Sequence, residues 1–257
     1  GVVFFVSLIV IWSTVQPSVP FWDCGEFIAA AFYLQVPHPP GTPFFLLLGK
    51  IFMAIPFAWN TALKMNLVSV FSSAFSVMFL YLIAVKLIEN YKGKKAENIL
   101  DALTTYIAAA IGALSFSFSD TFWFNGVEAE VYAFSTFLFA AVTWLMIVWN
   151  EKADKKDSEK YLLMIAYLIG LATGVHLMSV LAIVTVVMVI FFRKYSDDDK
   201  ALKQTGFIFI GHSVLILLIA VAKWSAETGT TPPSPEEYQA YDAGFKTIMV
   251  VVSLLVM

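Results

Sequence analysis

Cysteine and arginine are the scarcest chemically useful residues in this chain of 257 residues, which has one of each, Cys24 and Arg193. A single cysteine excludes an internal disulfide and a cysteine-rich metal site. Charged residues make up only 14% of the chain, the net charge is −3, and no basic run lies on an accessible face. Nucleic acid is therefore not an expected partner. Glycine-rich phosphate loops and the HExxH and GxSxG motifs are absent, so none of the enzyme classes that carry them is indicated.

Apolar sequence is what the chain has in abundance, with 60% hydrophobic residues, 24 Phe, 7 Trp and a mean hydropathy of +0.79. This composition predicts an all-α, polytopic membrane bundle, because about 20 apolar residues cross the hydrocarbon core as a helix. Residues 160–192 exceed one span, so we expect a tight helical hairpin there, turning near Gly170, Gly174 and His176. The hairpin brings the expected total to about eight spans; the others lie at residues 1–16, 64–86, 101–119, 129–150, 205–223 and 244–257.

Lysine and arginine predict the orientation of the bundle, because cytoplasmic loops are enriched in them. Three short loops hold 12 of the 16 basic residues, and we place all three inside. This placement requires the apolar stretch 41–57 to lie along the outer interface as an interfacial helix, which its short length, Lys50 and Pro56 permit. The first outer loop, residues 17–63, then faces away from the cytoplasm. The three basic loops are residues 86–100, 151–160 and 193–203.

The same topology gathers the acidic and histidine side chains on one membrane face. Both ends of the chain lie inside apolar runs, so we interpret residues 1–257 as the N-terminal membrane module of a longer protein whose C-terminal part is absent from this sequence. The residues expected on the outer face are Asp23, Glu26, His38, Asp120, Glu128, Glu130 and His176.

The stretch FWDCGEF in the first outer loop is the leading candidate for chemistry. Asp23 and Glu26 are three residues apart, so on a short helix they project from the same face. Phe21, Trp22 and Phe27 would partly desolvate them, and desolvation raises the pKa of a carboxylate toward the range of a general base. The alternative is a helix N-terminus, where acidic residues stabilise the dipole.

Three further polar positions are candidates beside this stretch. His38 precedes two prolines, which would hold its imidazole on a rigid elbow, although a solvated loop histidine is the alternative. Glu128 and Glu130 open a span in NGVEAEVY, where acids that compensate the helix dipole are the alternative. His176 is more often a packed or hydrogen-bonded histidine than a ligand, and Trp22 fits an interfacial aromatic belt.

Taken together, FWDCGEF, HPPGTPF and VEAEVYA resemble the bacterial membrane family related to protein O-mannosyltransferases, within the GT-C superfamily of glycosyltransferases that use polyprenyl-phosphate sugars. The resemblance covers essentially the whole chain. It implies a GT-C-like bundle with interfacial helices in the first outer loop, Asp23 as the catalytic acid and Glu26 as its companion. Two departures are a Cys-Gly insertion between those acids and the lack of an outer arginine for the lipid phosphate. The residues then expected to bind substrate are His38, Glu128, Glu130, His176, Trp22 and Lys50.

The activity that the resemblance implies is transfer of a sugar, with mannose expected, from a polyprenyl phosphate to a protein serine or threonine hydroxyl. Attack with Asp23 as general base would invert the anomeric carbon, on the extracytoplasmic face of a multi-pass inner-membrane protein. No cofactor and no metal are expected, although carboxylates there would suit Mg²⁺ or Mn²⁺. The expected partners are the lipid bilayer, the polyprenyl-phosphate sugar, and a protein or glycan acceptor. The alternative is a non-catalytic membrane subunit, or a lipid-linked glycan transporter or scaffold of an export complex.

Overall fold

A computed structural model of the chain describes residues 1–39, 41–176, 179, 181–195, 197–227 and 247. These residues form helices and no strand, which confirms the all-α prediction. In chain order the helices are α1 (Val2–Ser13), α2 (Cys24–Tyr33), α3 (Pro43–Ala54), α4 (Thr61–Lys92), α5 (Ile99–Ser117), α6 (Asp120–Gly126), α7 (Val131–Lys152), α8 (Glu159–Thr173), α9 (Leu181–Tyr195) and α10 (Asp199–Glu227).

The chain divides into two compact units, residues 1–190 and residues 191–257. In the second unit, the Asp198 carboxylate accepts backbone N–H groups in the first turn of α10. The predicted span at 205–223 falls within α10, whereas the predicted span at 244–257 lies outside the described residues apart from residue 247. The candidate site described below belongs to the first unit.

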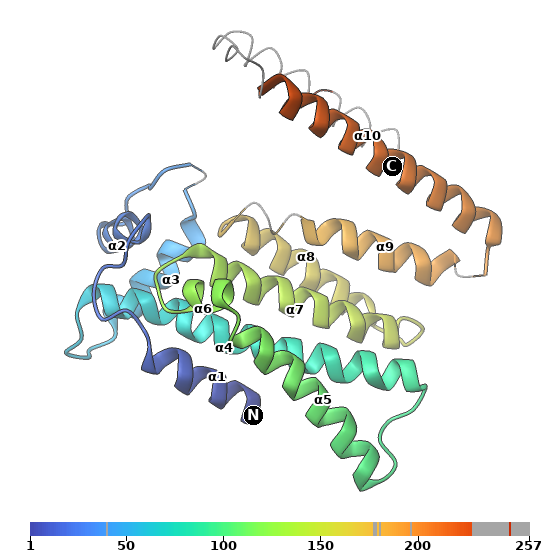
Figure 1. Cartoon of the computed structure of the whole chain (residues 1–257), viewed down its shortest axis with the longest axis horizontal. Coiled ribbons are helices and arrows are strands. Elements are labelled where there is room, and N and C mark those ends of the chain that lie inside the picture. The colour runs from blue at the N-terminus through green and yellow to red at the C-terminus, as the bar shows by residue number, and fades with distance from the viewer. Residues whose placement is uncertain (40, 177–178, 180, 196, 228–246, 248–257) are drawn as a thin grey trace. The chain divides into compact units, whose positions relative to one another are not determined.

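Helix α4 lies at the centre of the first unit and contacts α1, α2, α3, α5, α6 and α7 (Figure 1). The Asn60 side chain accepts the N–H of Leu63 and caps its start, and Gly93, with a φ of 68°, ends it in the left-handed conformation. Its 32 residues would extend about 48 Å, which exceeds the roughly 30 Å of a hydrocarbon core. The helix can therefore cross a bilayer and still project its first turns into the layer that carries the polar loops.

Three helices are long and apolar enough to cross a membrane within the described part of the chain: α4, α5 and α7. They cover the spans predicted at 64–86, 101–119 and 129–150. The segment 160–192 contains α8 and α9 as two separate helices, as the predicted hairpin requires. Helix α1 has 12 residues and α8 and α9 have 15 each, fewer than the roughly 20 of a perpendicular crossing, so the number of spans stays a prediction.

The two ends of the first unit differ in their chemistry. One end, here called the site end, carries α2, α3, α6 and the start of α7 (Figure 1). The opposite end joins neighbouring helices through the ion pairs Lys86–Glu151, at 2.7 Å, and Lys92–Asp101. The acidic loops and the basic loops of this unit thus lie at opposite ends, as expected. Helix α3, with 12 residues, is too short to cross, in keeping with an interfacial helix, but which end faces outside stays a prediction.

Small and hydroxyl side chains allow the helices to approach closely. Ser7 and Ser117 share a buried hydrogen bond of 2.8 Å between α1 and α5. A Cβ on Gly126 would lie 2.9 Å from the Ser73 hydroxyl oxygen, so α6 packs against α4 only because that position has no side chain. No described atom would lie within 4 Å of a Cβ on Gly170, whereas a Cβ on Gly174 would lie 3.3 Å from Phe44, so of these two glycines it is Gly174 that packs closely against α3.

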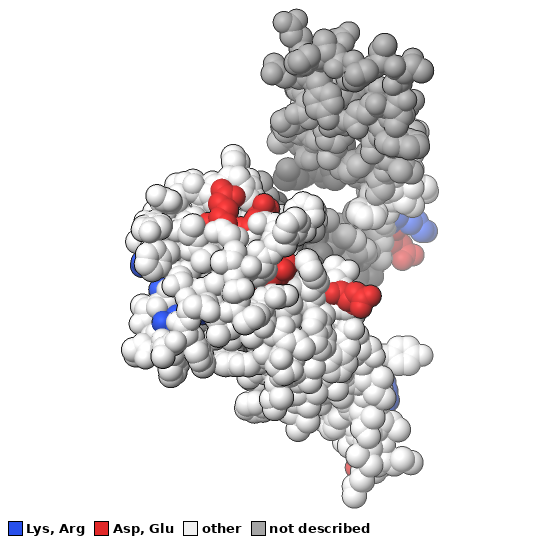
Figure 2. Space-filling view, turned by 60° about the vertical axis from the view of Figure 1, so that its left-hand side comes forward, with Lys and Arg blue, Asp and Glu red and all other residues white. Residues whose placement is uncertain are grey.

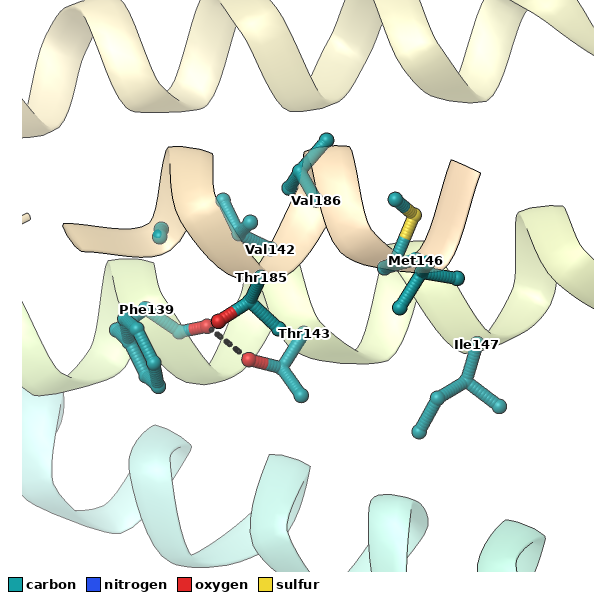
Figure 3. A pocket seen from close by; sticks show the side chains of 9 residues that line it. Phe139, Val142, Thr143, Met146, Ile147, Thr185 and Val186 are labelled. Atoms are coloured by element: carbon teal, nitrogen blue, oxygen red, sulfur yellow. Dashed lines mark hydrogen bonds between the residues drawn. The ribbon is translucent and has the colours of Figure 1, made fainter. Parts of the chain in front are cut away.

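A small cavity between α7 and α9 belongs to the helix packing. It has a volume of about 60 Å³ and is lined mainly by apolar side chains, among them Val142, Met146 and Val186 (Figure 3). The Thr143 hydroxyl, which faces it, donates to the Phe139 carbonyl at 2.9 Å and is satisfied within its own helix. A void of this size and lining holds no substrate.

The predicted orientation can be tested by cysteine labelling in intact cells. Ala58 precedes α4 at the site end, Asn90 lies in its last turn, and both are exposed, whereas the native Cys24 is buried. A membrane-impermeant maleimide should therefore label Ala58→Cys and spare Asn90→Cys and the native protein. If Asn90→Cys were labelled and Ala58→Cys were not, the orientation would be the opposite of the predicted one.

Candidate functional site

The backbone before α2 turns sharply and presents Asp23 at the start of the helix. Trp22 adopts a left-handed conformation with a φ of 62°, which is uncommon for a bulky residue and is often found at functional sites. Asp23 is the N-cap residue of α2, yet its side chain makes no capping hydrogen bond. Its carboxylate is thus not used to begin the helix, which weakens the interpretation of Asp23 as a structural cap.

Glu26 and His38 form a closely bonded pair. One Glu26 oxygen accepts the backbone N–H of His38 and the other contacts its Nδ1, each at 2.7 Å. The other ring nitrogen, Nε2, lies 3.9 Å from an Asp23 carboxylate oxygen. The side chains of His38 and Glu26 are each 44% exposed and that of Asp23 is 57% exposed, so a ligand can reach all three. The structure thus brings together three predicted site residues, here called the acid–histidine cluster.

The expected desolvation of Asp23 and Glu26 is wrong. Phe21 and Trp22 are exposed, and of the three aromatic neighbours only Phe27 is buried. The hydrogen bonds from His38 lower the pKa of Glu26, and its burial has only a smaller opposing effect. The same contact raises the pKa of His38, because a nearby carboxylate favours the imidazolium.

The second acidic motif lies directly beneath this cluster. The Cys24 thiol donates to a Glu130 carboxylate oxygen at 3.6 Å, across 106 residues of sequence. On the other side, the Ser69 hydroxyl donates to the Glu130 backbone carbonyl at 3.2 Å. Burial is the main cause that raises the pKa of Glu130, and the Asp23 carboxylate adds to it. FWDCGEF and VEAEVYA therefore form one site.

Glu128 is the more isolated of the two buried acids. Its side chain is 2% exposed, and burial, followed by repulsion from Glu130, raises its pKa to about 7. The site thus contains carboxylates in two environments, hydrated at Asp23 and Glu26 and buried at Glu128 and Glu130. The desolvated acids are the pair that the sequence had assigned to substrate binding.

Three other predicted residues lie around the site without joining the cluster. His176 is half-buried, with its ring 5.2 Å from that of Tyr132. Lys50 donates to the Phe32 carbonyl and lies 4.9 Å from the centre of the Phe32 ring, so it joins α3 to α2. Trp22 is 73% exposed. Substrate binding by His176, Lys50 and Trp22 stays a prediction.

Sequence reasoning missed two features of this end. The first is the contact of Cys24 with Glu130, for which the only sequence signal is the position of Cys24 inside FWDCGEF. The second feature is an open groove of about 390 Å³ at the site end, between α5, α6 and α7, lined only by uncharged side chains. Its lining residues are Phe116, Ser119, Thr121, Phe122, Asn125, Tyr132, Ala133 and Thr136.

Oxygen and nitrogen atoms of Asp23, Glu26 and His38 lie within 4.8 Å of one another, a spacing that a divalent cation can bridge. Both oxygens of Glu26, however, are already occupied by His38. Glu26 and His38 are held by their mutual hydrogen bonds, so the arrangement of these two side chains does not depend on an ion.

The charge pattern of this end is visible on the molecular surface. Figure 2 turns the site end toward the viewer and shows acidic side chains on an otherwise uncharged face, with basic ones toward its edge. The first unit is thus a helical membrane bundle that carries a reachable acid–histidine cluster above two buried carboxylates.

Comparison with known protein families assigns this membrane bundle to one of them. A family model described as the protein O-mannosyl-transferase TMEM260 N-terminal domain matches residues 23–199, well over half of the chain. The chain belongs to this family, which confirms the likeness to protein O-mannosyltransferases.

Two curated relatives support the assignment. The chain is 28% identical to protein O-mannosyl-transferase tmem260 of Dictyostelium discoideum over 163 residues, 62% of this chain and 18% of that protein. It is 29% identical to protein O-mannosyl-transferase TMEM260 of Mus musculus over 204 residues, 79% of this chain and 27% of that protein. The chain therefore spans about a quarter or less of these relatives. No solved structure matches the chain significantly.

The raised pKa of Glu128 predicts a pH-dependent stability. Since the pKa lies near 7 in the folded protein and 4.5 is the ordinary value, the fold favours the protonated acid and loses stability as the pH rises between these values. Glu128→Gln removes the ionisation and should stabilise the protein at pH 8 by up to about 3 kcal/mol, with little change at pH 4.5. Thermal unfolding in detergent measures this, with the exposed Glu97→Gln as control; equal stabilisation at both pH values would contradict the assignment.

Proposed function

We propose that the protein containing this chain is a glycosyltransferase that moves a sugar, mannose, from a polyprenyl phosphate to a serine or threonine hydroxyl of a protein. The observation that carries the proposal is the reachable cluster of Asp23, Glu26 and His38 at one end of an apolar bundle, in a chain of this family. The names of the two relatives, which state protein O-mannosyl transfer, support the reaction class.

The proposed sugar transfer requires the protein to supply one general base and to stabilise the charge on the departing phosphate. A sugar joined to a lipid phosphate already has a good leaving group, so its departure does not require the protonating acid that glycosidases use. The acceptor hydroxyl must lose its proton as it attacks the anomeric carbon, and a single displacement inverts that carbon. The acid–histidine cluster supplies the base, and its two candidates are Asp23, which the family likeness implies, and the imidazole of His38. No cofactor is part of the proposal, and no metal is required.

The bundle provides a place for the lipid. Helix α5 exposes a row of apolar side chains, Leu103, Ile107 and Ile111, suited to acyl or isoprenoid chains. With the site end on the extracytoplasmic face of the inner membrane, the sugar and the acceptor meet above the hydrocarbon core while the lipid tail remains in it.

The rival interpretation, a lipid-linked glycan transporter, fits the described helices less well. Transporters bind substrates near the bilayer midplane, with ionisable groups or interrupted helices there. In α4, α5 and α7 the charged residues lie in the first or last two turns. A non-catalytic subunit makes a different prediction, namely that loss of Asp23 changes nothing.

Transfer by the full-length protein in membranes tests the proposal. With a labelled polyprenyl-phosphate mannose and a Ser/Thr-rich acceptor, Asp23→Asn should lower transfer by about 10²-fold, the scale of losing a group that acts on the reacting proton. Asp120→Asn changes an exposed acid at the same end of the bundle and serves as the control. If the native protein transfers no sugar from any polyprenyl-linked donor, the proposed function is wrong. If the native protein and Asp23→Asn transfer sugar equally, Asp23 has no role in the reaction.

A further inference from the structure

The hydrogen bonds of His38 fix which of its ring nitrogens is free. Glu26, which is ionised at neutral pH because His38 lowers its pKa, can only accept hydrogen bonds. The Nδ1 atom, 2.7 Å from a Glu26 oxygen, therefore carries a hydrogen. In the neutral imidazole the lone pair then resides on Nε2, the nitrogen that faces Asp23. The backbone bond from His38 to the other Glu26 oxygen holds the ring in this orientation.

We propose that the imidazole of His38, and not Asp23, takes the proton from the acceptor hydroxyl through Nε2, with Glu26 as the residue that positions it. This inference rests on the proposed glycosyl transfer and specifies which group of the cluster acts as its base. Asp23 then orients the hydroxyl from the opposite side. A carboxylate, an imidazole and a hydroxyl in line form the arrangement in which a histidine base is oriented by an acid.

The gap between the two groups suits a hydroxyl. Nε2 and the Asp23 oxygen are 3.9 Å apart, so one oxygen atom can lie about 2.8 Å from both, within ordinary hydrogen-bond range. The gap is open to solvent, since both side chains are roughly half exposed. The Phe27 ring, 5.5 Å from the imidazole, supports its inner side.

The step balances without a further reagent. The acceptor oxygen forms a bond to the anomeric carbon, and the bond from that carbon to the phosphate oxygen breaks, with its electron pair leaving on the polyprenyl phosphate. The hydroxyl proton moves to Nε2 and gives an imidazolium, whose charge the Glu26 carboxylate stabilises. Release of that proton to water restores the neutral imidazole.

The electrostatic surroundings are appropriate to a base that works near neutral pH. The charged groups that act on His38 are Glu26 and Asp23 from α2 and Glu130 from the start of α7, and all three raise its pKa, Glu26 most strongly. Burial lowers the pKa of His38, but by less than the hydrogen bond to Glu26 raises it. Histidine already has the side-chain pKa closest to neutrality, and a base is most efficient when its pKa lies near the working pH.

The dependence of transfer on pH distinguishes the two candidate bases. In the full-length protein, the native rate should rise with pH as His38 loses its proton and then level off. His38→Asn can keep an N–H toward Glu26 but has no base at the Nε2 position. Its transfer rate should therefore be about 10²- to 10⁴-fold lower than that of the native protein, and the rate should no longer rise with pH. Glu26→Gln should move the midpoint of the rise to lower pH, toward about 6.5, since it removes the charge that raises the pKa. Asp23→Asn should lower the rate but keep the rise, and the exposed Glu97→Gln should match the native protein.

A measurement that does not depend on activity separates this inference from the proposed function. Nitrogen NMR of the histidine-labelled full-length protein, with the His38 signals assigned by their loss in His38→Asn, reports the protonation and tautomer of His38. We expect a hydrogen on Nδ1 in the neutral form and a titration midpoint that falls in Glu26→Gln. A neutral form with the hydrogen on Nε2, or a midpoint unaffected by Glu26→Gln, overturns the inference even if transfer is observed. Transfer by His38→Asn at the native rate overturns it as well.

Discussion

One turn of α4 holds together the two loops on which the site depends. The Asn66 side chain, fully buried, donates to the carbonyls of Gln16 and Ser18 at 2.7 and 3.1 Å, and so fixes the segment that leads to Asp23. Ser69, one turn further along, donates to the carbonyl of Glu130. Backbone carbonyls in an apolar bundle must find donors, because an unpaired buried polar group costs free energy comparable to a lost hydrogen bond. The central span therefore determines where both acidic motifs lie.

Burial divides the acids of the site into two kinds with opposite protonation behaviour. Hydrogen bonds to His38 favour the ionised form of Glu26, whereas desolvation favours the protonated forms of Glu128 and Glu130. Environments that push the pKa values of neighbouring groups apart are the usual way in which an active site obtains an acid and a base at the same pH. A buried carboxylate that destabilises the fold, such as Glu128, is difficult to explain by structure alone.

Apolar run lengths and loop charges predicted the long helices, the division of 160–192 into two helices and the common end of the acidic motifs, because each follows from local composition. The contact between Cys24 and Glu130 could not be predicted, since it depends on how α2 and α7 pack 106 residues apart. The exposure of Asp23 was not predicted, because Phe21 and Trp22, which were expected to shield it, are themselves exposed. Lys50 seemed available from sequence, but the end of α2 provides it with a carbonyl partner.

The site end of the bundle combines exposed polar side chains with buried carboxyl groups. Asp23, Glu26 and His38 lie on short elements that do not cross the membrane, and their side chains remain hydrated. Beneath them, Glu130 keeps its carboxyl group away from water through Cys24 and the surrounding core. The site end therefore presents hydrated groups at its surface and desolvated carboxyl groups below them. Under the proposed function, we place the departure of the sugar from the lipid phosphate at this change in polarity, near the first turn of α7.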